Sequence, residues 1–154
     1  MIRLFNGELI LNADQKTQVE VTPSLKGMLE AYKKKDLSGI LSYWAPDPDI
    51  VVIGSGVDEK AVGIGKYVES LMRDWAQAEV TSIGVKNFAV SAAGIVAWFS
   101  AELTFTYKIQ GKENILPGRM TGVMEKRNGK WLWVQMHYSL PNSNQEKGQS
   151  WPTP

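Results

Sequence analysis

The sequence predicts an α+β fold in which three helices come first and a long antiparallel run of strands follows. Apolar residues recur at helical spacing within 22–77, and most of 80–140 shows the alternation typical of strands. The chain has 154 residues, which suits one domain with one sizeable core. We therefore expect a domain over 22–141, an N-terminal arm at 1–21, and a flexible C-terminal tail at 142–154 that is rich in Asn, Ser, Gln, Gly and Pro.

The first predicted element is a small hairpin in the arm. Segments 3–5 and 8–11 flank Asn6-Gly7, a pair that favours a tight turn. An isolated hairpin is marginal in water, so this one needs a surface to lie on, and a partner subunit is one candidate.

Three helices are predicted next. Thr22-Pro23 indicates the start of the first, with Thr as the N-cap and Pro at the first helical position. Asp36 is expected to cap a short second helix, which ends before Pro46. The third is expected from about residue 65 to residue 77, with a buried stripe formed by Ile64, Tyr67, Val68, Leu71, Met72 and Trp75.

A β-branched strand is predicted at 49–53, between the second and third helices. Gly54-Ser55-Gly56 then opens a loop that leads to the third helix. This is not a phosphate-binding loop, because the Walker spacing and its lysine are missing.

Four long strands are predicted near 80–90, 95–109, 118–127 and 131–140. Strict alternation in the last strand places two sets of side chains on opposite faces, Trp131, Trp133, Gln135, His137 and Ser139 against Leu132, Val134, Met136, Tyr138 and Leu140. Because both faces need cover and the chain offers only three helices, a partner subunit is expected.

The turn at Asn128-Gly129 leaves two registers open. A two-residue loop pairs Arg127 with Lys130 and places Arg119 and His137 on opposite faces. A three-residue loop pairs Lys126 with Lys130 and places Arg119 opposite His137, beside Thr121 and Gln135.

The composition excludes several classes of function. Seventeen basic residues against sixteen acidic ones leave almost no net field, so neither a nucleic-acid partner nor a membrane surface is indicated. The absence of cysteine excludes disulfides and Cys-ligated zinc, and a single histidine excludes a multi-His metal site, which leaves only a carboxylate-rich site open. We predict no metal and no other cofactor. No convincing signal peptide or membrane-spanning run is present, which makes the cytoplasm the predicted location.

With this order of elements, the chain resembles the SnoaL-like branch of the nuclear-transport-factor-2-like superfamily, which also includes ketosteroid-isomerase-like proteins. The resemblance covers about 24–141 and is carried by Asp36-Leu37-Ser38-Gly39 through Ala45, by Gly118-Arg119-Met120-Thr121, by Gly129-Lys130-Trp131 and by His137-Tyr138-Ser139. It implies a cone with an open mouth, made by a curved sheet around the helices, and a homodimer formed through the outer face of the sheet. It also favours the three-residue register, since similar proteins place this Arg and His at the end of the pocket.

The chain departs from the enzymes of that superfamily. Ketosteroid isomerases use an Asp base on the first strand, and a helix-one tyrosine and a protonated Asp hold the oxyanion. Aligned on Asp36-Leu37-Ser38-Gly39, the position of the isomerase base falls at about Val52 and that of the tyrosine at about Met28. Neither side chain can do that chemistry, so steroid isomerisation is not expected.

The candidate site residues follow from this picture. Arg119 could anchor an anionic group or form a structural ion pair with Glu102. His137 could be a general base or only a hydrogen-bonding wall of the pocket. Glu102 could assist as an acid or base if it points inward, and is solvent-exposed if it does not. The other candidate ligand-binding residues are Gln135, Tyr32, Trp44, Trp98 and Trp133, and plain core is the alternative for the aromatic ones.

We therefore expect a homodimeric protein that binds a small, partly apolar, anionic molecule in the cone. An enzyme that uses His137 for proton transfer in the same pocket is the alternative. An oligomeric assembly module is a further one.

Overall fold

A computed structural model describes residues 3–5, 8–10 and 13–152 of the chain. Over these residues the chain forms a two-stranded sheet, three helices and a six-stranded sheet of order β4-β3-β8-β7-β6-β5. The elements are β1 (Arg3–Phe5), β2 (Glu8–Ile10), α1 (Gln15–Lys33), α2 (Leu37–Leu41), β3 (Val51–Ile53), β4 (Lys60–Val62), α3 (Ile64–Gln77), β5 (Glu79–Ala93), β6 (Val96–Ile109), β7 (Lys112–Arg127) and β8 (Lys130–Ser139).

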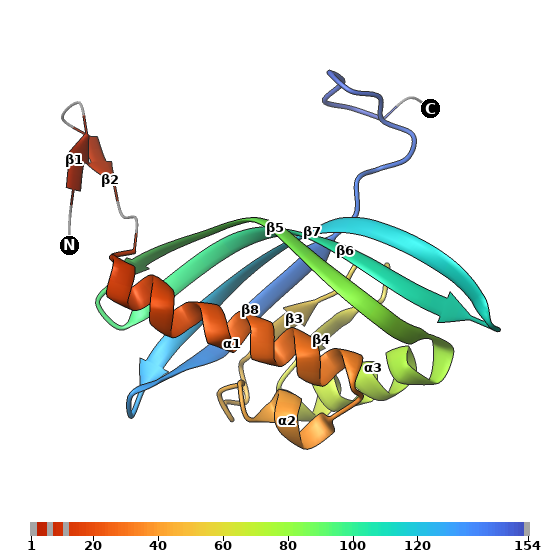
Figure 1. The fold of residues 1–154 in the computed structure, drawn as a ribbon, viewed down its shortest axis with the longest axis horizontal. Helices are drawn as coiled ribbons and strands as arrows, with labels where there is room; N and C mark the ends of the chain where they lie inside the picture. The colour runs from red at the N-terminus through yellow and green to blue at the C-terminus, as the bar shows by residue number, and fades with distance from the viewer. Residues whose placement is uncertain (1–2, 6–7, 11–12, 153–154) are drawn as a thin grey trace.

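The long strands arch over the helices, and α1 and α3 lie beneath one face of the curved sheet (Figure 1). Neighbouring strands from β5 to β8 are antiparallel, whereas β3 joins β8 in parallel. The predicted α+β class and the cone are confirmed. None of the helices in the described part of the chain is long and apolar enough to cross a membrane.

The predicted start of the first helix at Thr22-Pro23 is wrong. The helix begins eight residues earlier in the chain, where the side chain of the N-cap Asp14 accepts a 2.7 Å hydrogen bond from the Thr17 backbone N–H. Pro23 lies inside the helix and cannot donate to the carbonyl of Val19. Val19 is 65% exposed, so water can reach that side of the helix and satisfy the carbonyl. The Thr-Pro pair is therefore tolerated within α1 and does not begin it.

Most other predicted elements are confirmed. The arm strands pair as a hairpin, although its Asn6-Gly7 turn lies outside the described residues. Asp36 caps α2 by accepting from the Gly39 N–H, and α3 starts at Ile64, one residue from its predicted start. Within its predicted stripe Tyr67 and Leu71 are buried, whereas Met72 is 46% exposed. Residues 142–152 form turns without a helix or strand.

Two strands differ from their predictions, one in its existence and one in where it begins. Residues 60–62 are predicted as part of the loop after Gly54-Ser55-Gly56, but they form the three-residue strand β4, of which only Ala61 is buried. Strand β7 begins at Lys112 and not near residue 118, after a tight turn in which Gln110 and Gly111 have φ of 50° and 78°. It runs through Pro117, which is possible because β8 pairs with β7 only from Arg119 onward, so the backbone of Pro117 has a strand on one side only.

An extra residue in β8 decides which side chains face the helices. The turn is the two-residue one, with Arg127 opposite Lys130, so the three-residue register is wrong. Met124 pairs with Trp133 and Val123 with Gln135, which leaves Val134 unpaired in a β-bulge. The bulge therefore changes which set of alternate side chains in β8 faces the helices. Trp131 and Trp133 are buried, and beyond the bulge it is Met136, not Gln135 or His137, that is buried.

The centre of the hydrophobic core lies between α1 and the start of β8. Trp133 is fully buried and its indole N–H donates to the Ser24 hydroxyl at 3.1 Å. That hydroxyl donates in turn to the carbonyl of Trp131 at 3.2 Å. Trp44 packs against Trp133 with 5.8 Å between ring centroids. A buried serine on α1 is thus fully hydrogen-bonded to the sheet.

Substitution of Gly122 by alanine tests this packing. A Cβ at Gly122 would lie 2.6 Å from the ring of Phe99 and 2.9 Å from that of Trp133. We expect Gly122→Ala to lower the free energy of unfolding by about 1–3 kcal/mol, measured by chemical denaturation. In the matched control Gly65→Ala, the Cβ on α3 meets nothing within 4 Å, and the variant should be unchanged or more stable by up to about 1 kcal/mol. Equal stability of the two variants would contradict the packing described here.

Candidate functional site

A cavity of about 310 Å³ lies between the inner face of the sheet and helices α1 and α3. Its apolar wall comes from α1, β7 and β8, through side chains such as Met28, Met120 and Met136. Its aromatic wall includes Tyr32, Tyr67, Phe105, Tyr107 and Tyr138. The space is therefore largely apolar, with a few polar groups at defined places, as is usual for small-molecule sites.

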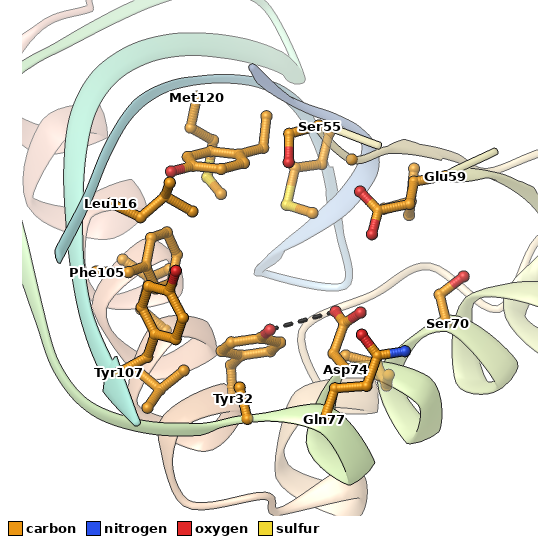
Figure 2. A pocket seen from close by; sticks show the side chains of 18 of the residues that line it. Tyr32, Ser55, Glu59, Ser70, Asp74, Gln77, Phe105, Tyr107, Leu116 and Met120 are labelled. Carbon is orange, nitrogen blue, oxygen red and sulfur yellow. Dashed lines mark hydrogen bonds between the residues drawn. The ribbon is translucent and has the colours of Figure 1, made fainter. Parts of the chain in front are cut away.

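The most distinctive polar group in the cavity is the carboxyl of Asp74 on α3. The hydroxyl of Tyr32 donates to its Oδ2 at 3.2 Å (Figure 2). Burial and the nearby charge of Glu59 raise the pKa of Asp74, and the hydrogen bond from Tyr32 opposes part of that rise. Burial, followed by the charge of Asp74, likewise raises the pKa of Tyr32, which therefore stays protonated and able to donate.

Backbone contacts hold this pair in position. The indole N–H of Trp75 donates to the carbonyl of Tyr32 at 3.1 Å, so α3 is tied to the end of α1 beside the pair. The Lys35 ammonium donates to the carbonyl of Trp75 at 2.7 Å and closes the same junction. Because both helices are tied at this point, the separation of Tyr32 and Asp74 is set by the fold.

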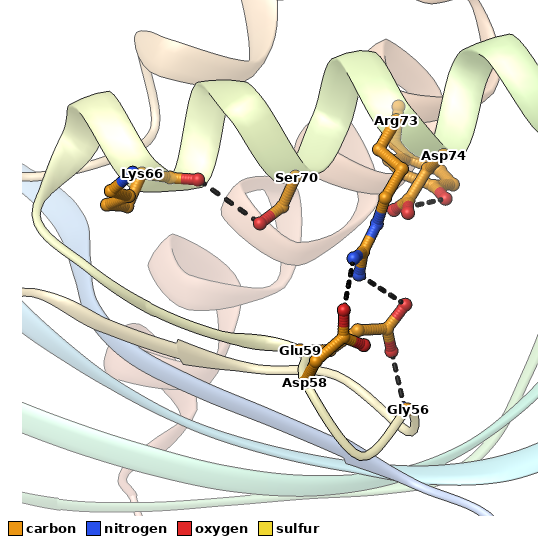
Figure 3. Close-up of polar contacts among 8 residues, drawn as sticks. Gly56, Asp58, Glu59, Lys66, Ser70, Arg73 and Asp74 are labelled. Carbon is orange, nitrogen blue, oxygen red and sulfur yellow. Dashed lines mark hydrogen bonds and ion pairs between the residues drawn. The ribbon is translucent and has the colours of Figure 1, made fainter.

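Glu59 brings a second carboxyl to the cavity from the loop before β4. It accepts from the Gly56 N–H at 2.6 Å, and Arg73 reaches its other oxygen at 3.3 Å (Figure 3). Arg73 also pairs with Asp58 at 2.8 Å. The guanidinium therefore ties the loop to α3, and the charge of Glu59 is balanced from outside the cavity.

Tyr138 supplies a hydroxyl at the sheet wall of the cavity. Its oxygen is buried and has no hydrogen-bond partner among the described residues. Burial raises the pKa of this phenol to about 12. The ring lies over Gly118, where a Cβ would come within 2.3 Å of the hydroxyl, so glycine makes room for it.

Of the residues predicted to form the site, Tyr32 alone lines the cavity. Trp44 and Trp133 are buried in the core, at 3% and 0% exposure. The remaining five lie on the outer face of the sheet, away from the cavity: Arg119, His137, Gln135, Glu102 and Trp98. The expected placement of His137 and Arg119 in the cone is wrong, because the bulge at Val134 turns His137 outward between Met136 and Tyr138.

The outer-face residues still lie near one another. Glu102 stands opposite Arg119 in the sheet, with Lys86 on its other side. No ion pair joins Arg119 to Glu102 in the described part of the chain, and Arg119 donates instead to the carbonyl of Leu140 at 3.4 Å. His137 is paired in register with Thr121. These groups form an exposed polar row on the outer face of the sheet, outside the cavity.

Asp74 and Glu59 were not predicted as site residues, although the sequence spacing of Asp74 indicates that it faces inward. It follows Tyr67 by seven residues and Leu71 by three, so it belongs to the buried stripe of α3. Met28 and Val52, at the isomerase positions, do line the cavity and are apolar. Within residues 3–5, 8–10 and 13–152, no three His, Asp or Glu side chains gather in a way that could hold a metal ion.

Comparison with known proteins identifies a family that this chain matches. A family model described as a SnoaL-like domain matches residues 21–143. No curated protein sequence matches the chain.

Solved structures share the fold at low sequence identity. An NTF2-like superfamily protein from Salmonella enterica serovar Typhimurium superposes with a TM-score of 0.76 at 20% identity, covering 90% of this chain and 100% of that one. A candidate dehydratase of the NTF2-like family from Streptomyces avermitilis has a TM-score of 0.71 at 17% identity, with 83% and 99% covered. A candidate calmodulin-dependent kinase II association domain from Exiguobacterium sibiricum has a TM-score of 0.68 at 11% identity, with 84% and 97% covered.

The raised pKa of Asp74 predicts a pH dependence of stability. A carboxyl whose pKa is higher in the folded than in the unfolded state binds protons more tightly when folded, so it favours folding at low pH. That contribution is lost as pH rises from the unfolded value, 3.8, through the raised folded value. We expect the stability of Asp74→Asn relative to wild type to increase with pH through this window, in denaturation curves from about pH 4 to about pH 8.

Asp47→Asn is the matched control and has the opposite sign. Arg127 holds the pKa of Asp47 below its usual value, so Asp47 stabilises the fold above 3.8 and loses that effect as pH falls. Asp47→Asn should therefore lose stability relative to wild type at the higher pH values. Parallel pH profiles for the two variants would contradict the environment assigned to Asp74.

Proposed function

The chain belongs to the SnoaL-like domain family, and from this we propose that it binds a small, partly apolar molecule in the cavity between α1, α3 and the sheet. The observation that carries the proposal is the Tyr32–Asp74 pair at one end of an apolar space of about 310 Å³. Such a space fits a small molecule with an apolar body and one polar end.

The anionic character predicted for the ligand depended on Arg119 and is not retained. Arg119 lies on the outer face, and no basic side chain is among the described residues that line the cavity. Two carboxyl groups are, those of Glu59 and Asp74. Charge repulsion therefore disfavours a carboxylate or phosphate in this space.

Proton transfer on the bound molecule is the second candidate function. A half-buried carboxyl with a raised pKa, in contact with a tyrosine hydroxyl, is suited to exchange a proton with a ligand. In this version Asp74 takes the role that the sequence suggested for His137. The role of an assembly module has only the fold shared with the Exiguobacterium association domain in support.

We also propose a homodimer formed through the outer face of the sheet. Trp98 is 37% exposed there and lines a groove together with Ser100, Val123 and Gln135. Tryptophan is enriched at protein–protein interfaces relative to the rest of the surface. The outer-face candidates Arg119, His137 and Glu102 would then lie at or near the contact. The predicted cytoplasmic location rests on the sequence alone.

Blocking the cavity tests the ligand proposal. Leu116 lines the cavity from β7, so Leu116→Trp fills it from the rim. In a thermal-shift panel of ketones, alcohols, amines and carboxylates, compounds that raise the melting temperature of the wild type should lose the effect in this variant. A bound ligand at about 100 times its Kd stabilises by about 2.7 kcal/mol.

The adjacent residue provides the control. Ile115 is 65% exposed on the opposite face, so Ile115→Trp adds the same side chain outside the cavity and should keep every ligand response. Ligand shifts that persist in Leu116→Trp would place binding elsewhere. A panel that shifts no form of the protein would refute the proposal.

Replacement of Trp98 by glutamate tests the dimer. We expect Trp98→Glu to raise the dimer dissociation constant at least about tenfold in sedimentation velocity, because a charge would be buried against the partner. Val19→Glu on exposed α1 should leave it unchanged. A wild type that sediments as a monomer, or a Trp98→Glu protein that dimerises as tightly, would reject this interface.

A further inference from the structure

We propose that the ligand of this cavity is a small arylalkyl amine in its protonated form, with its ammonium group against Asp74 on the side facing Glu59. The inference rests on the proposed function and names the chemistry of the molecule. It follows from the sign of the charges, the aromatic wall and the unused oxygen of Asp74.

The charges that reach the cavity are all negative. Glu59 and Asp74 face it from the side opposite Phe105 and Tyr107 (Figure 2). The basic side chains Arg73 and Lys35 do not line the cavity. Arg73 lies against Asp58 and Glu59 (Figure 3). Lys35 donates to the carbonyl of Trp75.

The two carboxylates differ in how many hydrogen bonds they accept. Glu59 receives hydrogen bonds from both Arg73 and the Gly56 N–H. Among the described residues, the Asp74 carboxylate receives one, from Tyr32 to Oδ2, which leaves Oδ1 for a donor from the ligand. A partly buried carboxylate with one hydrogen bond is poorly compensated, and a cation is the partner that compensates it best.

The remaining walls also suit a cation on an aromatic body. Tyr32 and Phe105 meet edge to face at 6.2 Å, and Phe105 meets Tyr138 in the same way at 5.4 Å. Aromatic ring faces attract an ammonium within about 6 Å. The same rings offer edge-to-face contacts to an aromatic ligand. A neutral alcohol would use the rings but not the charge.

Proton linkage distinguishes an amine from a neutral ligand. Burial and the charge of Glu59 raise the pKa of Asp74, and a bound cation lowers it by stabilising the ionised carboxylate. Amine binding therefore releases protons, and its affinity rises with pH until Asp74 is ionised. A ligand carbonyl that accepts from Asp74 requires the protonated acid, so its affinity would fall with pH over the same range.

Calorimetry with three matched probes tests the proposal. The probes are 2-phenylethylamine, 2-phenylethanol and 3-phenylpropionate, titrated into the full chain from about pH 5 to about pH 7.5 in buffers of different ionisation enthalpy. We expect the amine to bind at least about tenfold more tightly than the alcohol, with the carboxylate weakest. Amine affinity should rise with pH, and protons should be released on binding.

Variants locate the effect. Asp74→Asn should weaken amine binding at least about tenfold and leave alcohol binding within about twofold. Tyr32→Phe keeps the ring and the carboxylate and should retain amine binding. Glu69→Gln, on the exposed side of the same helix, removes the same charge outside the cavity and should change nothing.

The outcomes separate this inference from the broader proposal. Equal affinity for amine and alcohol, or an amine affinity that falls with pH, would overturn the amine assignment. If neutral compounds bind the wild type and are lost in Leu116→Trp while 2-phenylethylamine does not bind, the cavity is a ligand site and this inference is wrong. If nothing in the panel binds, both are wrong. Melting temperatures of the variants show whether each one is folded.

Discussion

The arrangement of this protein depends on one extra residue in β8. Val134 has no partner on β7, and the bulge it forms changes which alternate side chains of β8 face the helices. Before it, Trp131 and Trp133 enter the core beneath α1, and beyond it Met136 and Tyr138 line the cavity. Without the extra residue the strand would keep its alternation, and either the tryptophans or the cavity wall would face away from the helices.

Two sets of hydrogen bonds then fix the helices relative to that strand. Ser24 joins α1 to the carbonyl of Trp131 and the indole of Trp133, next to the bulge. At the other end of α1, Tyr32, Lys35 and Trp75 join it to α3. The cavity lies between these two junctions, so its polar pair is held by the same contacts that hold the core. This explains how an apolar space is kept open in a chain of modest size.

Much of the fold could be predicted from residue patterns, because helical spacing, the Asp36 cap and the turn at Asn128-Gly129 are local signals. The candidate site could not, because its position depends on which face each strand presents. A bulge has no strong local signature, and period-two alternation carried through it moved His137 and Gln135 to the wrong face. The inward-facing position of Asp74 could be predicted from the sequence, since its spacing from Tyr67 and Leu71 places it on the inner stripe of α3. Its pairing with Tyr32 joins residues 42 positions apart and needed the tertiary structure.

The edges of the long sheet bear on how the protein behaves at high concentration. Exposed strand edges can pair with other chains and lead to aggregation. The β5 edge is interrupted by irregularities near Thr81 and at Lys86–Ala89, where Asn87 has a φ of 50°. The overhanging part of β7 includes Pro117, which has no N–H to donate to an incoming strand. The irregular backbone of these two strands therefore makes them poor templates for strand addition.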